Sequence, residues 1–219
     1  MRVLPVATAA LWCQAGEQGR VDGVKTQNPP PACLHKALGS AAVIEAVARL
    51  ARDFTFPLVV DPVMISKHGA PLISLKAVRT LIERLFPLAT LVTPNLHEAS
   101  QLTGFPVMDR KSMEKALPVI AGMGPRNVLI KGGRLEQEGL DLLWSEGTIT
   151  PFTAPHIETP NTHGTGCVFS AAITARLALG ENLPAAVQGA KRFISEAIRT
   201  NPGLGTGRGP VNFHAPVPA

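Results

Sequence analysis

Residues Asn161–Cys167 (NTHGTGC) have the composition of an anion-binding loop that leads into a helix. Glycines let the backbone approach a ligand closely, and the first turn of a helix presents N–H groups with a partial positive charge. Gly164, Thr165 and Gly166 would therefore surround phosphate oxygens, and the helix start would favour the thiolate form of Cys167. The same residues also fit a glycine turn followed by a buried structural cysteine, so the stretch alone leaves both interpretations open.

The carboxylates of Glu98 and Asp61 both lie at or just after the ends of β-rich runs, where a magnesium site could form. Asn95 and Glu98 follow the β-rich run Thr90–Thr93, and amide and carboxylate oxygens are hard ligands suited to Mg²⁺. Their spacing is also that of a helix capping box, which is the interpretation that it favours in isolation. Asp61 ends another β-rich run before Pro62, where it fits a metal ligand, the partner of a basic side chain or a turn residue.

Lys131 is followed by Gly132 and Gly133 at the end of a further β-rich run. The glycines would admit a nucleotide, and the lysine ammonium would reach a phosphate as a point charge. An ordinary turn at the end of a strand explains the same three residues. His163 is interpreted as a loop residue, because no second His or Cys is spaced to share a metal with it.

Short apolar β-rich runs alternate with amphipathic helical patterns from Leu38 onward. The expected strands are 56–61, 90–93 and 127–131, followed by a hairpin of 140–144 and 148–152. The expected helices are 40–52, 166–179 and four more that begin at Ser74, Asn95, Asp109 and Pro184. This alternation predicts an α/β fold with a mostly parallel sheet and helices on both faces.

The candidate residues share one edge of this expected sheet. Ligands of parallel sheets bind at the carboxyl ends of the strands, which is where Asp61, Asn95 and Lys131 fall. A metal, a cation, oriented N–H donors and a base for an acceptor hydroxyl are the set that phosphoryl transfer needs. Taken together, these residues favour phosphoryl transfer. The sequence shows no internal repeat and no linker, so we expect a single domain over residues 1–219.

The composition limits other classes of function. The formal net charge of +5 comes from scattered basic residues and tyrosine is absent, which argues against nucleic-acid binding. No apolar run reaches the roughly 18 residues of a membrane span. Three cysteines without a C-x-x-C pair indicate neither a disulfide framework nor a zinc site. We expect a cytoplasmic protein that binds small anionic molecules and has no nucleic-acid or membrane partner.

Four ordered motifs resemble those of hydroxymethylpyrimidine/phosphomethylpyrimidine kinases, which belong to the ribokinase-like superfamily. The motifs are DPVM at 61–64, TPNLHEA at 93–99, KGG at 131–133 and NTHGTGC at 161–167, and the similarity includes the glycine-rich tail at 205–210. The resemblance implies a three-layer αβα fold. It also implies a kinase of thiamine biosynthesis that uses ATP and Mg²⁺ to phosphorylate hydroxymethylpyrimidine and then its monophosphate.

The resemblance also implies roles for individual residues. Asn95 and Glu98 would organise Mg²⁺ with help from Asp61. Loop residues 164–167 would form the anion hole, with Cys167 where the wider superfamily has a catalytic aspartate. ATP would contact four residues, namely Lys131, Gly132, Gly133 and Thr162. The acceptor would contact two residues, Val63 and Ala37.

The start of the chain departs from the family pattern. Residues 14–36 are polar and rich in glycine and proline, and the glycine-rich segment whose aspartate binds the pyrimidine in relatives is missing. We therefore expect residues 1–36 to be a divergent or truncated start. A pyridoxal kinase and a non-catalytic nucleotide- or pyrimidine-binding protein remain alternatives. A homodimer is expected, because similar enzymes often are dimers and an exposed sheet edge promotes pairing.

Overall fold

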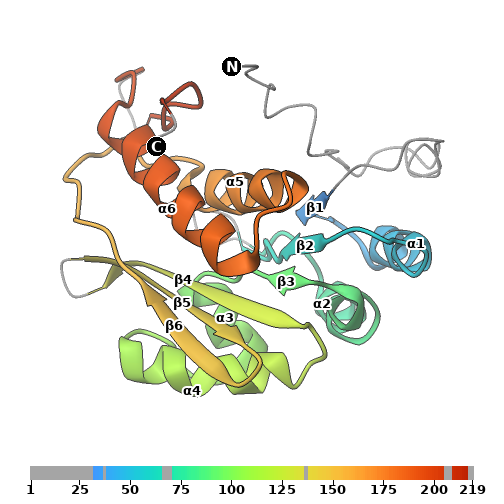
Figure 1. Ribbon diagram of the computed structural model, residues 1–219. Helices are drawn as coiled ribbons and strands as arrows, with labels where there is room; N and C mark the ends of the chain where they lie inside the picture. The colour runs from blue at the N-terminus through green and yellow to red at the C-terminus, as the bar shows by residue number, and fades with distance from the viewer. Residues whose placement is uncertain (1–31, 37, 66–70, 136–137, 205–208, 217–219) are drawn as a thin grey trace.

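The computed structural model describes residues 32–36, 38–65, 71–135, 138–204 and 209–216. Within these residues a six-stranded sheet has its strands in chain order, β1 to β6 (Figure 1). The strands are β1 (Cys33–Lys36), β2 (Leu58–Asp61), β3 (Leu91–Val92), β4 (Asn127–Leu135), β5 (Glu138–Ser145) and β6 (Thr148–Phe152). The first four strands are parallel, β5 pairs antiparallel with β4, and β6 pairs antiparallel with β5.

Helices cover both faces of the sheet (Figure 1). One face carries α1 (Ala41–Ala51), α2 (Leu75–Thr80) with its continuation η4 (Leu81–Leu85) and η5 (Phe86–Leu88), α3 (Leu96–Thr103) and α4 (Arg110–Ala121). The other face carries α5 (Thr165–Ala178) and α6 (Leu183–Arg199). The three-layer αβα arrangement expected from the sequence is confirmed.

Side-chain caps begin most of the helices. In each case a Ser, Asn or Asp oxygen accepts the backbone N–H three residues later, which satisfies a donor that the helix cannot. The capping residues are Ser40, Ser74, Asn95, Asp109 and Asn182. Helix α5 differs, because its N-cap is Gly164 in the left-handed region with φ of 82°. Glycine has no side chain to occupy the first N–H groups of that helix.

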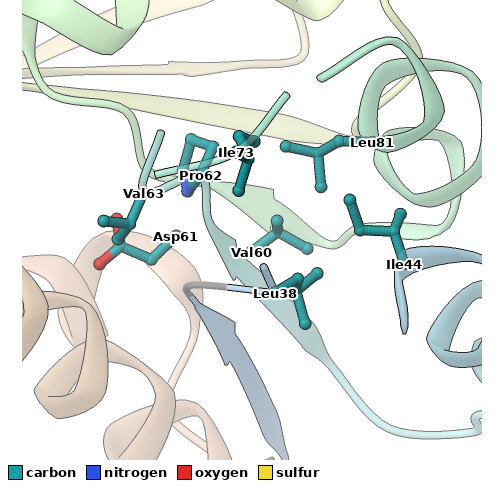
Figure 2. Close-up of a pocket in the computed structure, with 8 residues that line it drawn as sticks. All are labelled: Leu38, Ile44, Val60, Asp61, Pro62, Val63, Ile73 and Leu81. Carbon is teal, nitrogen blue, oxygen red and sulfur yellow. The ribbon is translucent and has the colours of Figure 1, made fainter. Parts of the chain in front are cut away.

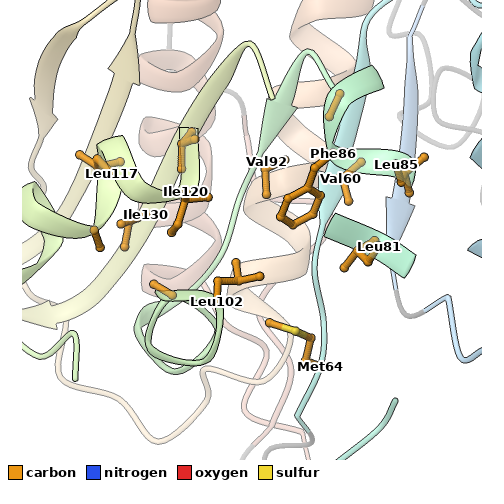
Figure 3. Close-up of a cluster of buried hydrophobic side chains, with 14 of the residues drawn as sticks. Val60, Met64, Leu81, Leu85, Phe86, Val92, Leu102, Leu117, Ile120 and Ile130 are labelled. Carbon is orange, nitrogen blue, oxygen red and sulfur yellow. The ribbon is translucent and has the colours of Figure 1, made fainter. Parts of the chain in front are cut away.

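The alternation of side chains along each strand decides which residues face which layer. Val60 and Ile130 pack into the larger hydrophobic cluster with helices α1 to α4, which Figure 3 shows around Phe86. Val59 and Leu129 pack into the second cluster, with α5 and α6. Asp61 and Lys131 each lie two residues after a member of the second cluster. The carboxyl ends of β2 and β4 therefore present their charged side chains toward α5.

The structure departs from the expected elements in two places. Strand β1 lies in the stretch 14–36, for which no element was expected, and the rest of that stretch up to residue 31 lies outside the described residues. Strand β4 continues past Lys131 to Leu135 through a register shift. The helix expected to begin at Asp109 is α4, and it continues through Pro118 to Ala121. No helix in the described part of the chain is long and apolar enough to cross a membrane.

Candidate active site

A buried ion pair joins the carboxyl ends of β2 and β4. Lys131 Nζ lies 2.7 Å from Asp61 Oδ1, and the side chains are 9% and 1% exposed. Burial by itself would lower the pKa of Lys131, but the charges of Asp61 and Glu98 outweigh it and the pKa is raised. Lys131 is therefore a cation at physiological pH, paired with Asp61 in a dry position and stabilised at longer range by the charge of Glu98.

The capping box expected as one interpretation of Asn95 and Glu98 is present. Asn95 Oδ1 accepts the N–H of Glu98 at 2.9 Å, and Glu98 Oε2 accepts the N–H of Asn95 at 2.8 Å. Burial raises the pKa of Glu98 to about 7, and the charge of Asp61 adds to this effect. The charge of Lys131 and the backbone of Asn95 and Met64 oppose it. Glu98 thus completes the cap of α3 and also interacts electrostatically with the Asp61–Lys131 pair.

One carboxylate oxygen of Asp61 is available to bind a cation. Asp61 Oδ2 is buried and has no hydrogen-bond partner in the described residues. An unpartnered buried carboxylate oxygen is costly, and Mg²⁺ in proteins commonly takes one or two carboxylates together with water and substrate phosphates. Asn95 Oδ1 already serves the cap. The residues present therefore fit a divalent cation, with Asp61 better placed than Asn95 to bind it.

A larger preformed metal cluster is not part of this arrangement. The described residues contain no group of three or more His, Cys, Asp or Glu side chains that could hold a metal ion. A cation bound here would therefore need oxygen ligands from water or a substrate in addition to the protein.

The glycine loop before α5 lies directly against Lys131. A Cβ added to Gly166 would lie 3.5 Å from Lys131 Nζ, which is ordinary van der Waals contact, so the helix start and the cation are immediate neighbours. The loop is closed by Thr165, whose Oγ1 donates to Thr162 O at 2.8 Å. Cys167 is half-buried, and in its thiolate form it would add to the raised pKa of Lys131. The loop and the two strand ends thus form one site from segments far apart in the sequence.

One hydroxyl group of this site, that of Ser170, was not singled out by the sequence. Ser170 is fully buried on α5, 2.9 Å from Thr93 Oγ1 and 3.4 Å from Lys131 Nζ, and its hydroxyl also contacts Gly166 O at 3.1 Å. It links the loop, β4 and the residue that follows β3. The sequence could have indicated Ser170, because this residue lies one helical turn after Cys167 and therefore on the same side of the helix.

The two glycines after Lys131 differ in their surroundings. A Cβ on Gly132 would meet Leu140 O at 2.3 Å, so Gly132 is required for the close approach of β5. Gly133 has φ of 63° and no atom within 4 Å of an added Cβ. Of the two, only Gly133 lies beside open space that a ligand could enter.

The residues expected to contact the acceptor are less well defined. Val63 is half-buried and its N–H donates to Asp61 O at 2.8 Å. It lines a small pocket that is apolar apart from Asp61, whose carboxylate points away from Ile44 and Leu81 in Figure 2. Ala37 lies outside the described residues.

The arrangement can bind phosphate chemistry. A buried cation, a carboxylate oxygen without a partner, and the uncapped start of a helix converge at one point, beside a half-buried thiol. Together they offer charge compensation, a cation ligand, N–H donors and a group that can accept a proton.

Comparison with known proteins agrees with this chemistry. Residues 35–212 match the family model described as phosphomethylpyrimidine kinase. The hydroxymethylpyrimidine/phosphomethylpyrimidine kinase of Haemophilus influenzae is 42% identical over 204 residues, which cover 90% of this chain and 76% of that protein.

Solved structures give the same family of folds. The Bacillus subtilis pyridoxal kinase, determined as an ADP complex, superposes with a TM-score of 0.82 at 33% identity and covers 90% of this chain and 75% of its own. The phosphomethylpyrimidine kinase of Clostridium difficile 630 has a TM-score of 0.71 at 34% identity, covering 82% of this chain and 74% of its own. The ribokinase-like fold and the kinase assignment expected from the motifs are confirmed, and the chain belongs to the phosphomethylpyrimidine kinase family.

Proposed function

We propose that this protein uses ATP to phosphorylate hydroxymethylpyrimidine and then its monophosphate, as a step of thiamine biosynthesis. The observation that carries the proposal is the position of the Asp61–Lys131 pair against Gly166 at the start of α5. This position puts a buried cation beside the N–H groups of a helix start, which suits the terminal phosphates of ATP. The names of the relatives support hydroxymethylpyrimidine as the acceptor.

Lys131, the start of α5 and Cys167 each have a part in the transfer. Lys131 and the N–H groups at the start of α5 hold the γ-phosphate and offset the charge on its oxygens. The acceptor hydroxyl attacks the γ-phosphorus and gives its proton to the thiolate of Cys167. The bond to the bridging oxygen breaks and ADP leaves. The transition state is loose, so positioning and charge contribute more than the base.

A magnesium ion is part of this proposal. Asp61 would hold it through Oδ2, and Glu98 would add negative charge nearby. When bound, Mg²⁺ neutralises charge on the phosphate oxygens. This assignment makes Asp61 the principal ligand and leaves Asn95 mainly as the cap of α3.

Pyridoxal is the second candidate acceptor. The pyridoxal kinases of Bacillus subtilis and Staphylococcus aureus superpose with TM-scores of 0.82 and 0.83, above the 0.71 of the Clostridium difficile phosphomethylpyrimidine kinase. Val63 is the one described residue that we expect to contact either acceptor, so the described part of the acceptor side does not favour one ring.

An ADP-release assay with the purified chain tests the proposal. We expect release to require Mg²⁺ and to have a higher kcat/KM with hydroxymethylpyrimidine than with pyridoxal. Measured per folded molecule, Asp61→Asn should abolish ADP release, whereas Glu83→Gln, at an exposed carboxylate of η4, should match the wild type. ADP release that neither acceptor stimulates would refute the kinase. A preference for pyridoxal would reassign its substrate.

Location and assembly complete the proposal. We expect a cytoplasmic homodimer, and the edge position of β1 in the described sheet is consistent with association.

A further inference from the structure

A second buried ion pair lies next to the Lys131 site, and the proposed chemistry does not use it. Lys191 Nζ of α6 lies 2.5 Å from Asp141 Oδ2 of β5, and the two side chains are 8% and 5% exposed. Lys191 Nζ also lies 5.9 Å from the ring centroid of Phe169 on α5. The pair therefore joins β5 to both helices of one layer.

The second oxygen of Asp141 reaches the nucleotide loop. Asp141 Oδ1 accepts the N–H of Gly132 at 3.1 Å. Gly132 follows Lys131 at the point where the register between β4 and β5 shifts. A register shift removes backbone groups from the regular ladder, and here a side chain supplies the acceptor that the neighbouring strand does not.

Stability alone does not explain such a pair. Taking two charges out of water is expensive, and apolar residues of similar volume often replace a buried ion pair without loss of stability. An apolar residue at position 141 would fill the space but could not accept the N–H of Gly132. The specific contribution of Asp141 is thus to hold the backbone next to Lys131.

We propose that Asp141 and Lys191 are positioning residues for the nucleotide. Asp141 fixes the amide of Gly132 and so the direction in which Lys131 leaves β4, and Lys191 holds Asp141 in place. The inference rests on the proposed function, because it takes Lys131 to bind the phosphates of ATP. Neither residue touches the reacting atoms.

Two double variants separate positioning from simple stability. Asp141→Leu/Lys191→Met and Asp141→Asn/Lys191→Met both remove the two charges, so neither leaves an unpaired buried charge. Only the asparagine variant keeps an oxygen that can accept the N–H of Gly132. The readouts are the Kd of AMP-PCP by calorimetry, the KM for ATP, kcat, and the melting temperature.

We expect the leucine variant to bind AMP-PCP about ten-fold more weakly than the asparagine variant. The KM for ATP should rise in parallel, while the Kd of hydroxymethylpyrimidine should be the same in both double variants. Equal AMP-PCP affinities in two folded variants would overturn the inference. If the leucine variant does not fold, Asp141→Ala/Lys191→Met replaces it.

A further measurement leaves Asp141, the hydrogen-bond acceptor of the Gly132 N–H, in place. Lys191→Arg keeps the charge but changes the geometry of the pair. We expect it to raise the KM for ATP while kcat stays within about two-fold of the wild type. An unchanged KM would contradict the role of Lys191. Failure of the wild type to bind AMP-PCP would instead refute the proposed function itself.

Discussion

Lys131 and Asp61 are charged groups that depend on one another, because each is almost completely buried. Removing one partner of such a pair leaves the other as an uncompensated charge, which typically costs about 3–5 kcal/mol. Loss of activity in a single Lys131 or Asp61 variant therefore has to be measured per folded molecule. Glu98 and Cys167 are better residues on which to test the site, since neutral replacements leave that pair intact.

Glu98 should make stability depend on pH. Its pKa is about 7 in the folded protein against 4.5 for the free side chain, mainly because of burial. Between these values the folded state keeps a proton that the unfolded state has lost, so the free energy of unfolding falls as the pH rises. Without Mg²⁺, we expect wild type to lose on the order of 3 kcal/mol relative to Glu98→Gln between pH 4.5 and 8.

Urea unfolding at several pH values measures this difference. Glutamine can still accept the N–H of Asn95, so the cap is preserved in Glu98→Gln and the comparison isolates the charge. Parallel stability curves for the two proteins would show that the carboxyl group is not held protonated by the fold.

Cys167 should be the more reactive of the two cysteines that the structure describes. Cys33 is 1% exposed on β1, whereas Cys167 is half-buried at the start of α5. We expect iodoacetamide to label Cys167 faster than Cys33 and Mg-ATP to slow that reaction, as followed by peptide mass spectrometry. Cys167→Ser should keep the fold and lower turnover about a hundred-fold. Undiminished turnover in that variant would show that the loop acts through its N–H groups alone.

Sequence patterns locate some residues of the site and miss others for physical reasons. Asp61 and Lys131 stand out because charged residues at the end of apolar strands need a partner. Ser170 does not, because one hydroxyl in an apolar helix is equally compatible with a core position. Asp141 and Lys191 are 50 residues apart, and only the packing of α6 over β5 brings them together.

Helices are the elements that the sequence predicts best in this chain. Their starts carry local capping signals, such as Ser40 and Asp109, which the structure confirms. The strands are less well predicted, because their extent depends on neighbours. Strand β1 follows a proline-rich stretch, and it is recognisable only by its pairing with β2.

The register shift in β4 leads to a prediction about its two glycines. Gly132→Ala would place a Cβ at 2.3 Å from Leu140 O, so β4 and β5 would have to separate. Gly133→Ala meets no atom within 4 Å but must adopt φ of 63°. We expect a loss of stability of about 3 kcal/mol for Gly132→Ala and about 1 kcal/mol for Gly133→Ala in urea unfolding. Equal losses of stability would mean that the backbone conformation at the register shift contributes more to stability than the close contact with β5.

The site results from the arrangement of the whole molecule. Strand alternation turns Asp61 and Lys131 toward the layer of α5 and α6, and the parallel order brings the ends of β2, β3 and β4 to one edge. The α/β class and this edge follow from the alternating pattern in the sequence. The face on which the site lies depends on which helices cover which side, and local patterns do not contain that information.

We propose above all that this chain transfers the γ-phosphate of ATP at the Asp61–Lys131–Cys167 site. A single-turnover experiment with γ-labelled ATP, Mg²⁺ and excess enzyme tests it by following label into hydroxymethylpyrimidine. We expect labelled hydroxymethylpyrimidine phosphate to form with the wild type, and to form far more slowly with Cys167→Ser, although both proteins bind ATP. ATP binding by the wild type without any transfer of label to the acceptor would contradict the account.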